Sequence, residues 1–104
     1  MEMNILEALK ERRNFNRNKA SARIHLERRK LNRSCSATLK NIGPGGLSCI
    51  SSVVLHVGEE LNVRIPHTGG IFEAEAMVIS ARQILGRCEV ELRFTRVRRD
   101  IPVL

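Results

Sequence analysis

Apolar and polar residues alternate one by one in six stretches of this chain, and this pattern limits what it can fold into. In SARIHLE, at residues 21–27, every second residue is apolar, which is the period of a β-strand with one buried face. Similar patterns occur in CSATLK (35–40), GLSCIS (46–51), ELNVRI (60–65), IFEAEAMVISA (71–81) and CEVELRF (88–94). Short polar connections separate the stretches. The sequence therefore predicts an all-β fold, a small six-stranded antiparallel barrel or sandwich.

The remaining segments set the domain organisation. ILEALKERR, at residues 5–13, has enough regularly spaced apolar residues for one or two helical turns. GPGG, at residues 43–46, predicts a tight loop between the second and third strands, because glycine permits unusual backbone angles and proline restricts the residue before it. A chain of 104 residues fits one domain. We expect a basic, helical or flexible segment over 1–19, the barrel over 20–96 and a tail over 97–104.

The positive charge is concentrated at the N-terminal side. The net charge is +7, and residues 1–33 contain ten Lys and Arg against four Asp and Glu, whereas residues 34–104 contain eight against seven. Such an asymmetry indicates an anionic partner. Charge alone leaves nucleic acid, an acidic membrane surface and a phosphorylated small molecule open.

Several classes of protein are not favoured by the sequence. It shows no motif for a catalytic nucleophile, acid pair or phosphate-binding lysine, so we predict no enzyme. The three histidines and three cysteines share no metal-ligand spacing, and the cysteines are odd in number and far apart, which favours reduced thiols in the core and no metal site. No apolar run approaches the roughly 18 residues of a membrane span. The N-terminus lacks a signal peptide, so we expect a cytoplasmic protein.

Two short motifs lie at predicted strand boundaries. RRNFNR places Arg13 and Arg17 in R-x-x-x-R spacing before the first strand, and NIGPGG places Asn41, Gly43 and Gly46 in N-x-G-x-x-G spacing between the second and third strands. The chain thereby resembles the PilZ domain, the receptor module for the bacterial second messenger cyclic di-GMP. Family members carry R-x-x-x-R and [D/N]-x-S-x-x-G at these two places. The resemblance extends over about residues 11–94.

The resemblance implies a set of ligand-binding residues. They are Arg12, Arg13, Arg17, Asn41, Gly43 and Gly46. An arginine fork can bind a phosphate or the O6/N7 edge of guanine with two hydrogen bonds, and an asparagine offers both a donor and an acceptor. Gly46 would let the backbone approach the ligand, and Phe15 would anchor the basic segment as the hinge of an arginine clamp. The family implies a receptor without cofactor that passes the signal to a protein partner.

One residue departs from the family pattern, and two other readings stay open. Gly43 replaces the motif's Ser, which removes a hydrogen-bond donor worth about 1 kcal/mol, or roughly tenfold in binding. A second R-x-x-x-R pair, Arg29 and Arg33, lies too close to the glycine motif and is interpreted as a hairpin turn. The alternatives are an adaptor that binds no nucleotide and a basic barrel that binds nucleic acid. The latter is the weaker, because the chain has three Phe and no Tyr or Trp for base stacking, and Phe72 and Phe94 favour the core.

Overall fold

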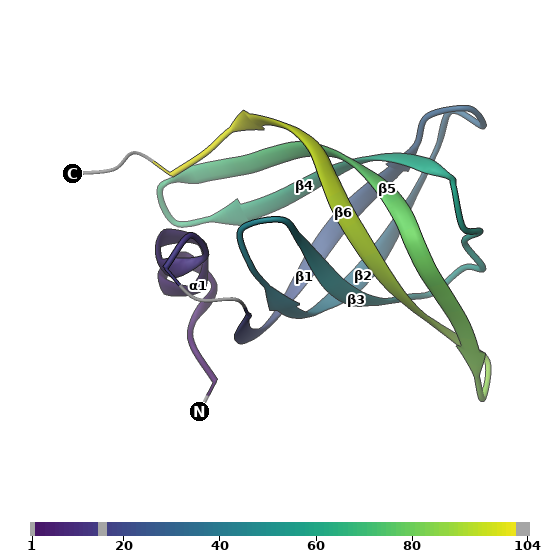
Figure 1. Cartoon of the computed structure of the whole chain (residues 1–104), viewed down its shortest axis with the longest axis horizontal. Helices are drawn as coiled ribbons and strands as arrows, with labels where there is room; N and C mark the ends of the chain where they lie inside the picture. The colour runs from purple at the N-terminus through teal and green to yellow at the C-terminus, as the bar shows by residue number, and fades with distance from the viewer. Residues whose placement is uncertain (1, 15–16, 102–104) are drawn as a thin grey trace.

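Six antiparallel strands form a closed barrel with a short helix at one end (Figure 1). The structure is a computed structural model that describes residues 2–14 and 17–101. Its elements are α1 (Ile5–Glu11), β1 (Asn18–Arg28), β2 (Arg33–Ile42), β3 (Gly46–Ser51), β4 (Glu60–His67), β5 (Gly70–Ile84) and β6 (Arg87–Arg99). The strand order around the barrel is β1-β2-β3-β6-β5-β4, and pairing of β1 with β4 closes it. The predicted all-β fold is confirmed.

The barrel is longer than the sequence predicted at both of its ends in the chain. It spans residues 18–99, not 20–96, because β1 begins at Asn18 and β6 continues to Arg99. The predicted boundary of the tail at residue 97 is therefore wrong. Val97 packs against the core, and the long β5 supplies backbone partners as far as the Glu73–Arg99 pair. The predicted N-terminal helical turns are confirmed as α1.

Every second side chain of each strand points into the barrel, because successive side chains of a β-strand point to opposite faces. These side chains fill the interior. Leu61, Val63 and Ile65 on β4 are fully buried, and Phe72 on β5 is the largest fully buried side chain. Cys49 and Cys88 lie in this core, and all three cysteines are free thiols. Burial raises the pKa of Cys49 to about 12. The prediction that cysteines occupy core positions is confirmed for these two.

Helix α1 is tied to the start of β1. Asn4 caps the helix, with its Oδ1 accepting a hydrogen bond of 2.8 Å from the Glu7 amide. Ala8 and Leu9 are buried against the barrel. The buried Asn18 side chain donates to the Ala8 carbonyl at 3.3 Å. The helix therefore packs on the barrel and is no detached arm. It has seven residues, and no helix of the described residues is long and apolar enough to cross a membrane.

The barrel has two different ends (Figure 1). At the α1 end lie the helix, the glycine loop at residues 43–45 and the end of β6. At the opposite end, which we call the loop end, lie the β1–β2 turn (29–32), the β3–β4 loop (52–59) and the β5–β6 turn (85–86). In Figure 1 these three connections reach the right-hand side of the molecule, away from α1.

Candidate ligand-binding site

The two sequence motifs meet at one hydrogen bond. Arg17 Nη1 donates to Asn41 Oδ1 at 2.9 Å, across the start of β1 and the end of β2. Lys19, two residues after Arg17, is the register partner of Asn41, so the pairing of β1 with β2 brings Arg17 close to Asn41. Arg17 Nη2 also lies 3.4 Å from Glu91 Oε2 on β6. The side chain of Arg17 is 39% exposed, so it is accessible from solvent.

An open depression of about 330 Å³ lies beside Asn41 on the outer face of β2, β3, β5 and β6. It is lined by Lys40, Asn41, Ser48, Cys49, Ser80, Arg82, Glu89, Val90 and Glu91. The pairing of β2 with β3 is irregular between Leu39 and Asn41, and such bulges re-aim side chains near binding sites. The irregularity lies where Asn41 meets the depression.

The depression carries charges of both signs. Lys40 Nζ lies 3.1 Å from Glu89 Oε1, and this hydrogen bond lowers the pKa of Glu89. Glu91 Oε1 accepts from Ser48 Oγ at 3.2 Å. The surface therefore offers cations suited to phosphates beside carboxylates suited to N–H donors. Glu91 was missed from the sequence, because an acidic residue on an exposed strand position has no distinctive pattern.

The glycine loop is held by its own backbone and by β6. The Gly43 amide donates to the Gly46 carbonyl at 2.9 Å, and the Phe94 amide donates to the Gly45 carbonyl at 2.8 Å. A Cβ atom on Gly46 would lie 2.0 Å from the Leu92 carbonyl oxygen. The closeness of β6 is therefore enough to explain why residue 46 is glycine, and its approach to a ligand stays a prediction.

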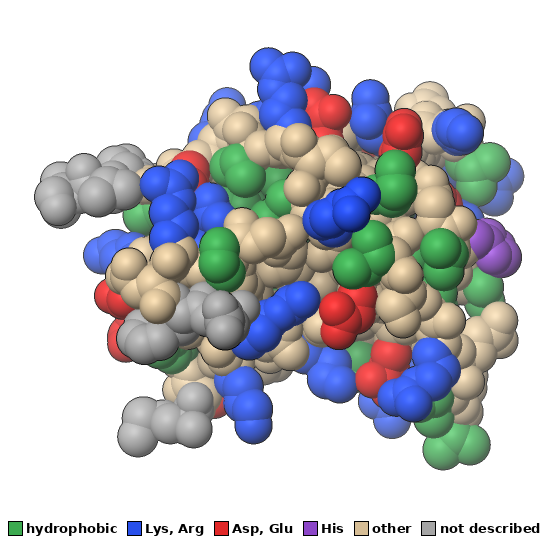
Figure 2. Space-filling model, viewed as in Figure 1, with side chains coloured by type: hydrophobic (Ala, Val, Ile, Leu, Met, Phe, Trp, Pro, Cys, Tyr) green, Lys and Arg blue, Asp and Glu red, His purple; other side chains and the backbone are tan. Residues whose placement is uncertain are grey.

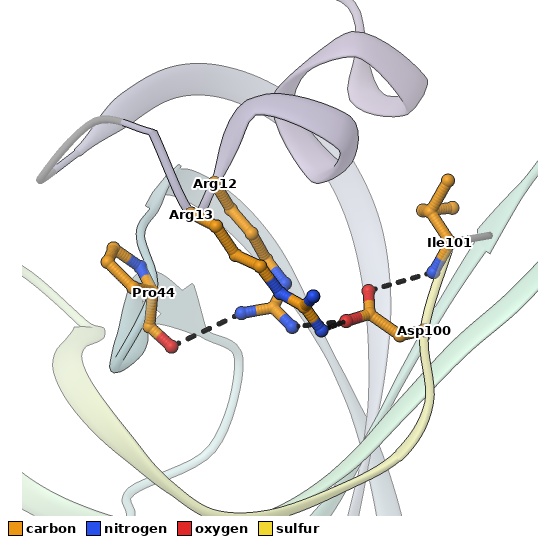
Figure 3. A network of polar contacts seen from close by, with 5 residues as sticks. All are labelled: Arg12, Arg13, Pro44, Asp100 and Ile101. Carbon is orange, nitrogen blue, oxygen red and sulfur yellow. Dashed lines mark hydrogen bonds and ion pairs between the residues drawn. The ribbon is translucent and has the colours of Figure 1, made fainter. Parts of the chain in front are cut away.

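Arg12 was predicted to lie in a basic segment that contacts the ligand, but in the structure its side chain is buried. It is 2% exposed, and its guanidinium lies 5.1 Å from the ring centroid of Phe72 and 5.8 Å from that of Phe94. Arg12 Nη1 donates to the Pro44 carbonyl at 3.2 Å, and Nη2 pairs with Asp100 Oδ2 at 2.6 Å (Figure 3). Arg12 thus joins α1, the glycine loop and the residue after β6. A ligand contact of Arg12 stays a prediction.

Asp100 collects two arginines and a backbone amide. Arg13 Nη2 pairs with the same Asp100 oxygen as Arg12, and the Ile101 amide donates to the other oxygen at 2.8 Å (Figure 3). Partial burial of Asp100 alone would raise its pKa, but the hydrogen bonds from Arg12 and Ile101 and the charge of both arginines lower it overall. Asp100 is a second residue that the sequence did not reveal, because its partners lie far away in the chain.

The structure therefore distributes the predicted site residues over two clusters. Arg17 and Asn41 meet beside the depression, whereas Arg12 and Arg13 meet at Asp100. Phe15, the predicted hinge, lies outside the described residues. Among the described residues, no three His, Cys, Asp or Glu side chains are grouped as a metal site would require.

Comparisons with known proteins identify a family and a similar fold. The family model described as PilZ domain matches residues 11–101. Among solved structures, the fold is similar to "PilZ domain with c-di-GMP of YcgR from Escherichia coli", with a TM-score of 0.63 and 17% sequence identity over 81% of this chain and 78% of that chain. Among curated proteins, none matches this sequence.

Proposed function

This chain belongs to the PilZ domain family, and we propose that it is a receptor domain for cyclic di-GMP, the ligand named for the similar domain of YcgR. The observation that carries the proposal is the 2.9 Å hydrogen bond from Arg17 to Asn41, which brings both family motifs to the edge of one open depression. In this proposal the ligand lies on the outer face of the barrel at Asn41. Arg13 and Arg17 close over it from the segment before β1.

Arg17 is poised to exchange its present partners for a ligand. One partner is the neutral Asn41 oxygen, and the other is the half-exposed Glu91 at 3.4 Å. Exposed ion pairs contribute roughly 1 kcal/mol or less to stability. A forked, charge-assisted contact with a phosphate is stronger, so transfer of Arg17 to the ligand is favourable. Asn41 is then free to bind the edge of a guanine.

Arg13 can leave Asp100 at little cost. Its side chain is 57% exposed, and Asp100 keeps hydrogen bonds from Arg12 and the Ile101 amide when Arg13 departs. Arg12, which is buried, then remains to hold α1 and the glycine loop in place. We therefore assign the ligand contacts to Arg13 and Arg17 and a supporting role to Arg12.

The carboxylates of the depression suit the base of the proposed ligand. Guanine presents N–H donors on one edge, and a carboxylate accepts such donors. Glu91 already accepts a hydrogen bond from Ser48 and is 48% exposed. Once Arg17 moves to a phosphate, Glu91 is an acceptor for that edge. When Arg13 and Arg17 move to the ligand, the surface before β1 changes, and a protein partner would bind this changed surface. Ligand binding in this proposal involves no catalytic step and no cofactor.

Isothermal titration tests the proposal. We expect cyclic di-GMP to bind with micromolar or tighter affinity and GMP to give no heat, because GMP cannot bridge the arginine pair and Asn41. Arg17→Ala should weaken binding strongly, and Arg64→Ala, which removes an exposed arginine paired with Glu73 on the outer face of β4, should not. No heat with cyclic di-GMP at high micromolar concentration would refute receptor function and favour an adaptor.

A further inference from the structure

The loop end of the barrel carries apolar side chains that the chain itself does not bury. Leu31 is 54% exposed, Val57 67% and Leu85 94%, and Val53 and Val54 are also exposed. They belong to the three connections at the loop end, opposite α1 (Figure 1). In the same view, hydrophobic side chains at this end lie among Lys and Arg side chains (Figure 2).

Leu85 has a backbone conformation that is unfavourable for leucine, and contacts within the chain do not compensate for it. The two-residue turn Leu85–Gly86 has positive φ at both positions, 47° and 78°, as in type I′ turns, where Asn, Asp or Gly is preferred. A non-glycine residue with positive φ is strained, because its Cβ atom crowds the following carbonyl oxygen. Leu85 is 94% exposed, so packing within the chain does not offset this strain, and a contact with another molecule would give leucine a role at this position.

The valines of the β3–β4 loop are presented by an anchored loop. Leu55 is 1% exposed and fixes the middle of the loop in the core. The Gly58 amide donates to the Val78 carbonyl at 2.8 Å, and the His56 amide donates to Glu59 Oε2 at 3.1 Å. Exposure of the valines is therefore built into the loop.

The cations around these tips are only partly neutralised. Arg28, Arg29 and Arg82 pair with Glu59, Glu60 and Glu89. Within residues 2–14 and 17–101, no ion pair engages Lys30, Arg33 or Arg87, which are exposed. Lys30 and Arg33 flank Leu31, and Arg87 follows the turn that bears Leu85. Each of these two apolar tips therefore has an unpaired cation beside it.

We propose that the loop end docks on a membrane surface that contains anionic lipids. Aliphatic tips at one end of the barrel can enter the boundary between headgroups and acyl chains, and flanking Lys and Arg side chains can bind anionic headgroups. The chemistry favours a lipid surface over a protein, because the tips project from separate loops and combine aliphatic groups with unpaired positive charge. The depression beside Asn41 lies on the side wall of the barrel and shares Arg82 and Glu89 with the surroundings of the tips. Arg17 and Asn41 lie outside the loop end, so docking of the tips leaves these two residues accessible to the nucleotide.

Co-sedimentation of the full chain with vesicles tests this proposal. We expect binding to vesicles of phosphatidylcholine with one third phosphatidylglycerol and no binding to pure phosphatidylcholine. Leu85→Asn should weaken vesicle binding about tenfold, the value of one buried leucine side chain. The same substitution should raise the melting temperature, because asparagine tolerates positive φ. Lys30→Ala and Arg33→Ala should each weaken binding about fivefold, as expected for one basic residue near an anionic surface.

Matched controls make the result decisive. Ile79→Asn removes an exposed aliphatic side chain from the middle of β5, and Arg96→Ala removes an exposed cation toward the α1 end; neither should change vesicle binding. The proposal is overturned if anionic vesicles do not bind, if neutral vesicles bind equally, or if Leu85→Asn binds like the natural chain. Binding of a protein by the loop end without any affinity for vesicles would likewise overturn it.

Discussion

Arg12 Nη2 lies 2.6 Å from Asp100 Oδ2, which pairs the residue after α1 with the residue after β6. The contact is buried on the arginine side and stacked against Phe72 and Phe94. It therefore links both flanks of the barrel to the glycine loop through one side chain.

Arg12→Ala should lower the free energy of unfolding by about 3 kcal/mol. The substitution removes one of the two arginines that neutralise the Asp100 carboxylate, and it opens a space beside two aromatic rings. Arg13→Ala is the matched control. Arg13 pairs with the same carboxylate but is exposed, so its loss should cost less than about 1 kcal/mol. Urea denaturation measures both values. Equal losses for the two variants would show that burial of Arg12 contributes nothing.

The Asp100 carboxylate makes stability depend on acid. Its pKa is lowered in the folded protein relative to the ordinary 3.8, so its stabilisation is complete above pH 3.8 and is lost as pH falls through the lower, folded-state value. Asp100→Asn should therefore be less stable than the natural chain at neutral pH, and the difference should shrink as the pH falls below 3.8. Urea titrations across this range measure the difference. A difference independent of pH would contradict the charge-based origin.

Arg17→Ala should weaken cyclic di-GMP binding by about 2 kcal/mol, or roughly thirtyfold, because it removes a charge-assisted contact. Arg33→Ala, in the second R-x-x-x-R pair at the loop end, should bind the ligand normally. Isothermal titration of both variants measures the affinities. Should Arg33→Ala prove as damaging, the site would not lie beside Asn41 and Arg17.

Gly46→Ala should destabilise the fold by about 2 kcal/mol or more, because the new Cβ atom would overlap the Leu92 carbonyl oxygen at 2.0 Å. Gly45→Ala is the neighbouring control, since its Cβ atom would meet nothing within 4 Å. Its effect should stay within about 0.5 kcal/mol. Thermal melting of both variants distinguishes them, and equal melting temperatures would show that β6 does not enforce glycine at residue 46.

Gly43→Ser should tighten ligand binding by up to about tenfold, because it restores the hydroxyl donor of the family motif. Among the described residues, the glycines with positive φ are Gly58, Gly70 and Gly86. Gly43 is not one of them, so a side chain at residue 43 does not meet the strain of a positive φ. Titration and thermal melting of the variant test this together. An unchanged melting temperature with unchanged affinity would mean that residue 43 does not face the ligand.

The strands were predictable because alternation records which face is buried. β3 was predicted with its observed bounds, Gly46–Ser51. The end of β6 was missed because its last residues, Thr95 to Arg99, carry three arginines that resemble a solvated tail. Their strand conformation depends on hydrogen bonds to the long β5, and pairing of this kind is not written in the local sequence.

The sequence identified candidate site residues only where they belong to a family motif. The family motifs assigned Arg17 and Asn41 to one ligand site, and the structure brings the two side chains into hydrogen-bond contact. Their contact with a ligand stays a prediction. The burial of Arg12 was not foreseeable, because a run of arginines normally indicates an exposed surface. Its burial depends on Asp100, Phe72 and Phe94, which reach it only after the barrel has closed.

The closure of the barrel rests on a short seam. β1 and β4 are paired only from His25 to Arg28 and from Leu61 to Arg64, whereas β5 and β6 are paired along almost their whole length. Amide hydrogens on this seam should exchange with solvent before those of β5 and β6, because local opening begins where few backbone hydrogen bonds must break. The first part of β1 lies beyond the seam, where α1 and the Met3–Lys19 hydrogen bond cover it. We therefore expect α1 and the Met3–Lys19 hydrogen bond to determine how often the β1–β4 seam opens, because they hold the adjacent part of β1.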